Sequence, residues 1–525
     1  MNETATKRRA LLLATCCAVL AACGGGGASG PEPTPVATQA VPPGPEPLPA
    51  PEPAASDDDT LRALAIAAGV TGDPALNRSL PTPDDPVVVL GRALFFSKAL
   101  GGDLDSACVS CHHPALGGGD GLSLPVGVGA VDPDQLGPGR EKATGVVDVP
   151  RNAPTVFNAG LWDRALFWDG RVEAPGAVPA ANGAGGGIRT PDVAFGQIDA
   201  QAGAHLPAAQ ARFPVTSVSE MRSADFEPGA DNEAVRARLA ARVGGYGVGA
   251  GELARNDWLP LFRAAFDASG SAEALVTFDN IAFALGEYER SLVLVDNPFF
   301  AYVRGDDDAL TDLEKEGLRL FYTAAEDDGG NCSVCHAGDL FSDEDFHTVA
   351  FPQIGPGTGD PLGGDAGRER ETGDATDRFR FRTPSLLNVA VTGPFGHAGS
   401  YETLGRVLRH YDDPRGSVAD FFDDGGVCTL AQFEDRADCA SLWPDSEAAT
   451  ERALEKLGRE RDDGTSDFPN LILNGADRDA LEAFLGALTD PCVRDRACLA
   501  VFVADASEDA DDLRVVAVDA AGEPL

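Results

Sequence analysis

Basic residues are few in this sequence of 525 residues. Lysine and arginine together number 41, against 83 aspartate and glutamate residues, which gives a formal net charge of −42. Binding of nucleic acid or of anionic lipid headgroups needs a basic surface, so this balance excludes both as partners. Methionine is rarer still, with two residues in the chain, and the alternating patterns typical of β-strands are scarce.

Long apolar runs are also missing, because the only candidate, residues 10–22, is too short to span a bilayer. It follows Lys-Arg-Arg at 7–9 and is typical of a secretory signal. The run ends in Leu-Ala-Ala-Cys-Gly, which resembles a bacterial lipoprotein signal with cleavage before Cys23 and acylation of its thiol. A plain secretory signal with an incidental cysteine is the alternative.

These features predict how the N-terminal part of the chain is used. Residues 1–22 form the signal peptide, and residues 23–58, rich in proline, glycine and alanine, form a tether. We therefore expect an exported protein on the periplasmic side of a bacterial membrane. Its contact with that membrane is expected only through the lipid anchor at Cys23.

Two C-x-x-C-H motifs carry the clearest chemical signal. They consist of Cys108, Cys111 and His112, and of Cys332, Cys335 and His336. Two thiols on one helical turn can add to the two vinyl groups of a haem, and the adjacent histidine supplies the proximal iron ligand. A zinc site is the alternative, but export and the histidine directly after each cysteine pair favour two covalent c-type haems.

Four of the eleven cysteines lie outside the signal, the lipid site and the haem motifs. We pair Cys428 with Cys439 and Cys492 with Cys498. Both pairs are expected to form disulfides, which an exported protein can keep.

Helical patterns precede both haem motifs. Apolar spacing predicts helices over residues 87–100 and 311–324, and each is followed by a C-x-x-C-H motif, which indicates an internal duplication. A longer amphipathic helix is predicted over residues 273–293. The Asn-Pro pair at 297–298 is expected to stop it.

Two stretches of unusual composition look like insertions. Residues 174–212 are rich in glycine, alanine and proline, and residues 421–466 are acidic and carry one predicted disulfide. His205 lies in the first stretch, and we expect it at the surface. The tail contains Leu-Arg-Val-Val-Ala-Val, where a short strand is expected.

Further motifs make the sequence similar to a known family. They are LGRALFF at 90–96, RNAPT at 151–155, FWDGR at 167–171 and FRTPSLLN at 381–388. Their order and spacing around the haem motifs resemble the bacterial dihaem cytochrome c peroxidases and their relative MauG. The resemblance covers about residues 85–175, 210–300 and 310–490, and it fails over the tether, the insertions and the tail.

This resemblance implies an all-α fold of two cytochrome c-like domains, each with one covalent c-type haem, plus loop-rich insertions. We place an N-terminal peroxidatic domain at residues 59–308, a C-terminal electron-relay domain at 309–490 and a tail at 491–525. It also implies that hydrogen peroxide reacts at the N-terminal haem, while the C-terminal haem relays electrons.

The second haem departs from the common family pattern, in which methionine is the second iron ligand. Met1 leaves with the signal, and Met221 lies on the peroxidatic side. The matching position, 14 residues after His397, is Tyr411, and MauG also has a tyrosine there. We expect Tyr411 to be the distal ligand. His410 is the rival ligand, and packing of Tyr411 as a core aromatic residue is the other alternative.

The first haem departs as well. Many family members place a histidine shortly after the first haem motif, where it blocks the iron until the enzyme is reduced. Residues 124–130 contain no histidine, and His113 cannot turn onto the opposite face of the same haem. The resemblance therefore implies an open, five-coordinate haem held by His112 alone.

Two residues match the family's pocket above that open haem. Glu220 corresponds to the distal carboxylate, which takes a proton from the near oxygen of peroxide and returns it to the far oxygen. Pro214 would line the same pocket. The alternative for Glu220 is a helix capping box with Ser217, because Ser217 to Glu220 fits the S-x-x-E pattern.

The remaining matches concern the region between the haems. Trp168 corresponds to the tryptophan that carries a hole over a gap too long for one efficient hop; a buried core tryptophan is the alternative. The family also has a calcium ion there. Its matching ligands are the Asn152 side chain and the carbonyls of Thr392 and Pro394, completed by water, although Asn152 could simply cap a turn.

The tyrosine ligand bears on function, because an anionic tyrosinate stabilises oxidised iron and lowers its potential. This favours a MauG-like role, in which peroxide oxidises both haems and the pair then oxidises a partner protein. Two alternatives remain: a peroxide-scavenging peroxidase fed by a small cytochrome c or a cupredoxin, and a non-enzymatic dihaem electron carrier. An electron carrier requires two protein ligands on each iron. The absence of histidine from residues 124–130 argues against a second ligand on the first iron.

Overall fold

The computed structural model describes residues 57–468 and 470–525. The predicted signal peptide, nearly all of the tether and the lipid site at Cys23 lie outside the described residues. Within the described part, none of the helices combines the length and the apolar character needed to cross a membrane.

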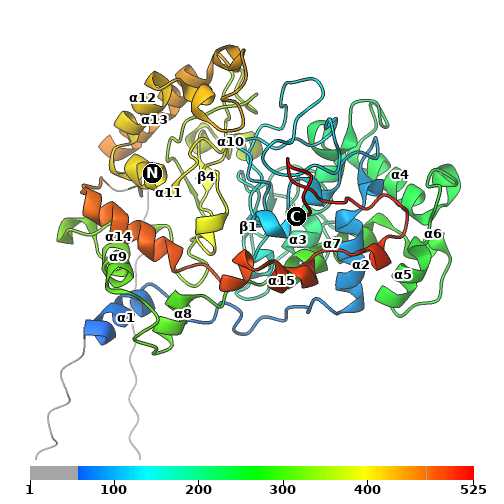
Figure 1. Cartoon of the computed structure of the whole chain (residues 1–525), viewed down its shortest axis with the longest axis horizontal. Coiled ribbons are helices and arrows are strands. Elements are labelled where there is room, and N and C mark those ends of the chain that lie inside the picture. The colour runs from blue at the N-terminus through cyan, green and yellow to red at the C-terminus, as the bar shows by residue number, and fades with distance from the viewer. Residues whose placement is uncertain (1–56, 469) are drawn as a thin grey trace, which may run out of the picture. The chain divides into compact units, whose positions relative to one another are not determined.

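Helices make up most of the regular structure (Figure 1). The α-helices are α1 (Asp57–Ala67), α2 (Pro86–Phe96), α3 (Leu206–Gln210), α4 (Asn232–Gly244), α5 (Trp258–Ala265), α6 (Ala272–Leu275), α7 (Phe278–Ser291), α8 (Pro298–Val303), α9 (Asp312–Tyr322), α10 (Glu369–Thr372), α11 (Leu404–Asp412), α12 (Pro414–Asp423), α13 (Ser446–Asp462), α14 (Gly475–Gly486) and α15 (Arg496–Leu499). Within the described residues, the strands are two antiparallel pairs of two-residue pieces, β1 (Ala165–Leu166) with β2 (Val172–Glu173), and β3 (Phe346–His347) with β4 (Phe381–Arg382). The described chain is thus helix-rich with little strand, as expected.

The same helix crossing occurs twice, which agrees with the predicted duplication. Helix α2 packs on α7, and helix α9 packs on α14. A Cβ atom on Gly91 would lie 1.9 Å from the Ala284 carbonyl oxygen, and one on Gly317 would lie 2.0 Å from that of Ala480. Any larger side chain would therefore force either helix pair apart. Each pair also follows the predicted order, because α2 and α9 directly precede the two haem motifs.

Two apolar cores surround these helix pairs, and the ends of the described chain are exchanged between them. The first core contains α2, α4, α5 and α7, together with Val493, Phe502 and Val515 of the tail. The second core contains α8, α9, α11 and α14, together with Ala65 of α1. Helices α1 and α8 thus belong to the second core and the tail belongs to the first, while the domain division at 308/309 stays a prediction.

Local capping explains where the helices begin. Thr311 and Glu314 form a capping box at the start of α9, so the predicted helix over 311–324 is confirmed within two residues. The predicted helix over 87–100 instead ends at Phe96, and Ser97 caps a separate 3-10 turn. In both places a hydroxyl side chain, of Thr311 or of Ser97, accepts a hydrogen bond from a backbone N–H group and so starts the helix or turn.

The prediction of one helix over 273–293 was wrong. The chain forms α6 and α7, because the Thr277 side chain accepts a hydrogen bond from the Asn280 backbone N–H and starts a new helix. The expected stop at 297–298 was also wrong. Asn297 accepts from the Phe300 N–H and Pro298 occupies the first turn of α8, so this pair begins a helix.

The two predicted insertions are built into the fold. The first ends in α3, which packs on α7. His205 is 4 % exposed and lies 2.7 Å from Glu287, so the expectation of a surface position was wrong. The second insertion carries the confirmed Cys428–Cys439 disulfide and α13; the Cys492–Cys498 disulfide is confirmed as well.

The tail runs beside the first core in Figure 1 without forming a regular strand within the described residues. Val515 donates its backbone N–H to Phe96, and Lys98 donates to Leu513. Isolated bridges join Ser97 to Arg514 and Gln135 to Val518. The expected strand at this place is therefore replaced by single pairings.

Candidate functional site

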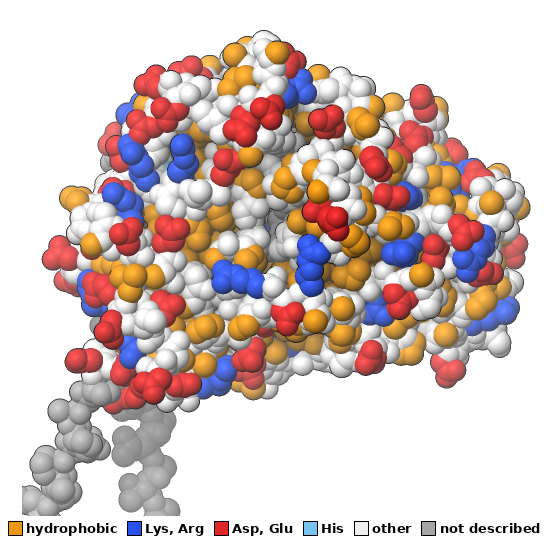
Figure 2. All heavy atoms as spheres, in the orientation of Figure 1, with side chains coloured by type: hydrophobic (Ala, Val, Ile, Leu, Met, Phe, Trp, Pro, Cys, Tyr) orange, Lys and Arg blue, Asp and Glu red, His pale blue; other side chains and the backbone are white. Residues whose placement is uncertain are grey.

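One cavity of about 760 Å³ is lined by both C-x-x-C-H motifs. Its wall contains each of the predicted haem-binding residues, namely Cys108, Cys111, His112, Cys332, Cys335, His336 and Tyr411. Residues 108–110 and 332–334 form short 3-10 turns, and the first residue of each, Cys108 and Cys332, lines this space. The face in Figure 2 carries many acidic side chains, and apolar side chains gather in its central hollow.

The two motif histidines have the tautomer and the neutral charge state of metal ligands. The Nδ1 of His112 lies 3.2 Å from the Gly118 carbonyl oxygen, and that of His336 lies 2.9 Å from the Phe341 carbonyl oxygen. These bonds place the proton on Nδ1 and leave the Nε2 lone pair for a metal. Burial lowers the pKa of both imidazoles, of His112 to about 4, so both rings are neutral, which is the ligand form.

The thiols fit the same group. All four motif cysteines are free of disulfides and lie on the cavity wall. Two thiols, a neutral imidazole and an apolar cavity at each motif match the requirements of a covalent c-type haem. A zinc ion would need its ligands within a few ångströms, and the described residues offer one such group of three, Cys335 with Asp343 and His347, which shares its thiol with the second motif.

Glu220 lies on the cavity wall in a π-helical turn, Val218–Arg222. Burial raises the pKa of its carboxyl, while Arg171, Arg370 and Arg151 oppose the rise and Asp169 adds to it. Ser217 makes no side-chain capping bond at this turn, so the alternative capping box is not formed. Pro214 belongs to the preceding 3-10 turn, Pro214–Thr216, and lines the same cavity.

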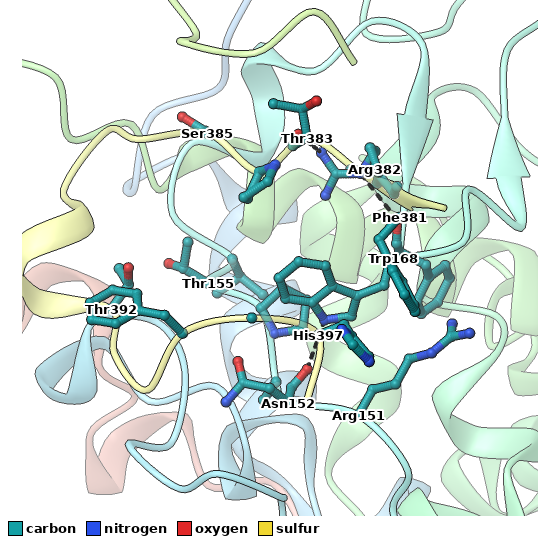
Figure 3. Close-up of a pocket in the computed structure, with 18 of the residues that line it drawn as sticks. Arg151, Asn152, Thr155, Trp168, Phe381, Arg382, Thr383, Ser385, Thr392 and His397 are labelled. Atoms are coloured by element: carbon teal, nitrogen blue, oxygen red, sulfur yellow. Dashed lines mark hydrogen bonds between the residues drawn. The ribbon is translucent and has the colours of Figure 1, made fainter. Parts of the chain in front are cut away.

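Trp168 lines the same cavity. Its indole Nε1–H donates to the Asn152 carbonyl oxygen at 3.0 Å, and the Asn152 backbone N–H donates to the His397 carbonyl oxygen at 2.9 Å (Figure 3). The His397 ring stacks on Phe381 with 3.8 Å between centroids. Trp168 is thus half-buried against the cavity rather than enclosed in an apolar core.

Tyr411 and His410 occupy different environments although they are neighbours on α11. Tyr411 lines the cavity, and burial raises the pKa of its phenol. His410 is fully buried outside the cavity wall: its Nδ1 accepts from the Tyr401 hydroxyl at 2.9 Å, and its Nε2 donates to the Val349 carbonyl at 2.8 Å. Both ring nitrogens of His410 are therefore already used.

Residues 85–308 match the di-haem cytochrome c peroxidase family. The chain is 31 % identical over 324 residues to the methylamine utilization protein MauG of Methylorubrum extorquens, covering 62 % of this chain and 68 % of that one. It is 30 % identical over 310 residues to the cytochrome c551 peroxidase of Pseudomonas aeruginosa, covering 59 % and 67 %.

The chain belongs to the di-haem cytochrome c peroxidase family. Among solved structures, a MauG-like protein associated with microbial copper homeostasis aligns with a TM-score of 0.49 at 22 % identity, covering 80 % of this chain and 93 % of that one. Family membership implies two haems, in agreement with the two C-x-x-C-H motifs and the shared cavity.

The residues that match the family's calcium ligands also lie on the wall of this cavity. Asn152, Thr392 and Pro394 all line it. The Asn152 Nδ2 donates to the Leu122 carbonyl oxygen at 2.8 Å, so Oδ1 is the atom left for a cation. This bond reaches 30 residues along the chain, so the side chain does not cap a local turn.

A buried ionic cluster lies next to Trp168, and sequence reasoning missed it. Arg151 binds Asp365 through two bonds of 2.6 and 2.8 Å and binds Asp169 at 2.6 Å. All three residues are buried. Arg151 and Asp169 stood in the quoted motifs, but nothing in the sequence joined them to Asp365.

Other members of the di-haem peroxidase cavity were missed for the same reason. Arg171 and Arg370, whose charges act on Glu220, line it, as does Gln210. Glu289 lines it beside Cys108. Burial alone raises the pKa of Glu289 to about 8. The FWDGR motif contains Arg171, so this motif was the available signal for one of them.

Proposed function

We propose that this chain is an exported, MauG-like di-haem peroxidase that reduces hydrogen peroxide at an open N-terminal haem. Its C-terminal haem relays electrons from a partner protein. The position of Tyr411 supports a MauG-like role within the family. Tyr411 lies on the wall of the cavity, while neighbouring His410 has both ring nitrogens bound elsewhere.

The first haem site would be held by Cys108, Cys111 and His112. When bound, that haem supplies an iron that takes up hydrogen peroxide and exchanges electrons with it. No histidine occurs in residues 124–130, and His113 is buried away from the residues that line the cavity, so neither provides a second ligand.

Glu220 is the acid–base group of the proposal. Its carboxylate takes a proton from the peroxide oxygen that lies nearer the iron and returns it to the farther oxygen, which leaves as water. The positive side chains of Arg171 and Arg370 hold back the rise of the Glu220 pKa that burial causes.

The second haem site would be held by Cys332, Cys335 and His336, with Tyr411 as the fourth protein contact. A phenolate there lowers the affinity of the site for an electron. Trp168 lies between the two sites and carries a hole from one to the other. A calcium ion held by Asn152, Thr392 and Pro394 would connect the chain that follows the first haem motif to the chain that follows the second.

The partner is a protein that gives up electrons, either an oxidised protein substrate or a small cytochrome c or cupredoxin. With a formal net charge of −42, the chain favours a partner that is basic or weakly charged. Export and acylation of Cys23 would hold both at the periplasmic side of a membrane.

Low-temperature EPR of the haem-loaded ferric protein tests this function, with Tyr411→Phe as the variant. We expect one high-spin and one low-spin signal, with only the low-spin signal altered by the substitution. One equivalent of hydrogen peroxide should then remove both ferric signals of the native protein. Two low-spin signals that peroxide leaves unchanged would instead identify an electron carrier and overturn the proposal.

A further inference from the structure

The acidic insertion packs directly on the segment that follows the first haem motif. Leu122, Leu124 and Val126 share a buried cluster with Phe421, Val427, Leu430 and Phe433. The insertion lies outside the stretches that resemble the family, and its contact with the first haem region joins parts of the chain about 300 residues apart.

One side chain of the insertion pairs with the segment as a strand would. The Leu124 backbone N–H donates to Gln432 Oε1 at 2.9 Å, and Gln432 Nε2 donates to the Leu124 carbonyl oxygen at 2.7 Å. The Cys428–Cys439 disulfide closes the loop that carries Gln432. From the same loop, Arg436 binds the Gly145 carbonyl. The loop therefore bonds to this segment at Leu124 and to the chain that follows it at Gly145.

The segment in turn packs closely against the backbone of Glu220, the proposed acid–base residue. Val128 donates its N–H to the Ser219 carbonyl oxygen at 3.2 Å. A Cβ atom on Gly127 would lie 2.4 Å from the carbonyl oxygens of both Ser219 and Glu220, so only glycine allows this approach. Arg140 fixes the segment from another side, because its Nε donates to the Val126 carbonyl at 2.8 Å.

We propose that Gln432, held by the Cys428–Cys439 loop, is a positioning residue for Glu220. It acts through residues 124–128, which it fixes against the Ser219–Glu220 backbone, and so sets where the carboxylate stands in the cavity. This inference rests on the proposed role of Glu220. It means that a part of the chain outside the family pattern determines the geometry of the peroxide site.

The decisive variant is Gln432→Met, which keeps the length of the side chain but makes neither bond to Leu124. The matched control is Glu434→Met, an exposed position in the same loop. Both are compared with the native haem-loaded protein by hydrogen exchange and by peroxide turnover over a range of pH. Haem content and thermal unfolding verify that each variant is folded.

We expect Gln432→Met to speed hydrogen exchange in residues 122–128 and 217–222. It should also lower kcat/KM for peroxide about tenfold, since a displacement of 1 Å can cost up to about 100-fold. Because Glu220 would become more solvated, the acidic limb of the pH profile should move toward that of an ordinary glutamate. Glu434→Met should stay within about twofold of the native rate.

The double variant Cys428→Ser, Cys439→Ser provides a second route, because it loosens the loop without touching Gln432. It should also speed hydrogen exchange in residues 122–128 and 217–222. The control double variant Cys492→Ser, Cys498→Ser should leave residues 122–128 protected from exchange. Unchanged exchange and unchanged kcat/KM in Gln432→Met would overturn the inference.

Failure of the underlying function would be recognised separately, with Glu220→Gln. If that variant reacts with peroxide as fast as the native protein, the role of Glu220 is wrong. If it is slow while Gln432→Met is not, the role of Glu220 stands and only the positioning by Gln432 is wrong.

Discussion

The Trp168 indole donates its N–H to the backbone carbonyl oxygen of Asn152 at 3.0 Å. The other side of the same residue, the Asn152 N–H, donates to the His397 carbonyl oxygen at 2.9 Å. Asn152 therefore connects Trp168 to the chain that follows the second motif (Figure 3).

This connection predicts the behaviour of Trp168→Phe. Phenylalanine keeps the aromatic packing but has no N–H, and it is harder to oxidise. Transfer between the two haem sites should slow by about tenfold or more, which corresponds to at least about 1.4 kcal/mol of activation free energy. Freeze-quenched EPR after one equivalent of peroxide should then show rapid loss of one ferric signal, whereas the native protein loses both. Loss of both signals at the native rate would show that Trp168 is only a packing residue.

Tyr411→Met tests the ligand of the second haem. Replacing a phenolate by a thioether favours reduced iron, and axial ligands tune haem potentials over about 0.8 V. We expect the midpoint potential of the low-spin haem to rise by a few tenths of a volt in a spectroelectrochemical titration. His410→Gln is the control, since His410 makes its bonds outside the cavity and its loss should leave the low-spin EPR signal in place.

The pH dependence of peroxide turnover should report Glu220. Burial raises the pKa of this carboxyl above its ordinary value of 4.5, and the reaction begins with its charged form. The value of kcat/KM should therefore rise with pH, with an apparent pKa above 4.5. In Glu220→Gln this acidic limb should disappear and the rate should fall by about 100-fold or more. A limb that persists in the variant would belong to another group.

The buried cluster around Arg151 should contribute to stability. Asp365→Ala removes two of its hydrogen bonds and leaves the guanidinium with Asp169 in a buried place. We expect a loss of about 3 kcal/mol in the free energy of unfolding, measured with denaturant. Glu451→Ala breaks an exposed pair with Arg415 and should cost less than about 1 kcal/mol. Equal losses in the two variants would contradict this ranking.

Glu289 should make the protein less stable as pH rises. Burial raises its pKa in the folded chain to about 8, whereas in the unfolded chain it titrates near 4.5. The folded chain therefore holds the proton longer, and its stability falls by up to about 1.4 kcal/mol per pH unit between these values. Glu289→Gln cannot lose a proton, so its Tm should vary less between pH 5 and 8. A parallel decline in both proteins would assign the effect to other groups.

Much of the fold followed from local patterns. Helix α9 and the start of α2 agree with apolar spacing, and the family match gave the order of the motifs. The break at Thr277 was not visible because apolar residues continue on both sides of it, and Val276 and Phe278 share one core. His205 was misplaced because its partner Glu287 lies on another helix, 82 residues away.

The residues of the site could be predicted from the sequence only where they belong to a recognisable motif or lie at a fixed spacing from one. Trp168, Glu220 and Tyr411 lie in segments that match the family or follow a motif at a fixed spacing, and the structure brings all three to one cavity. Gln432 has no such signal. Its pairing with Leu124 spans 308 residues and depends on how an insertion folds back, which no local pattern encodes.

The exchange of chain ends between the two cores has a consequence for how the protein can be divided. Helix α1 is fastened to the second core through Asp58, which accepts from Tyr302 and pairs with Lys315, while the tail completes the first core. A fragment that stops at residue 308 would lose the tail residues of its own core and leave α1 without α9. The two haem regions should therefore unfold in one transition, and neither is expected to survive as a separate protein, although each has its own helix pair.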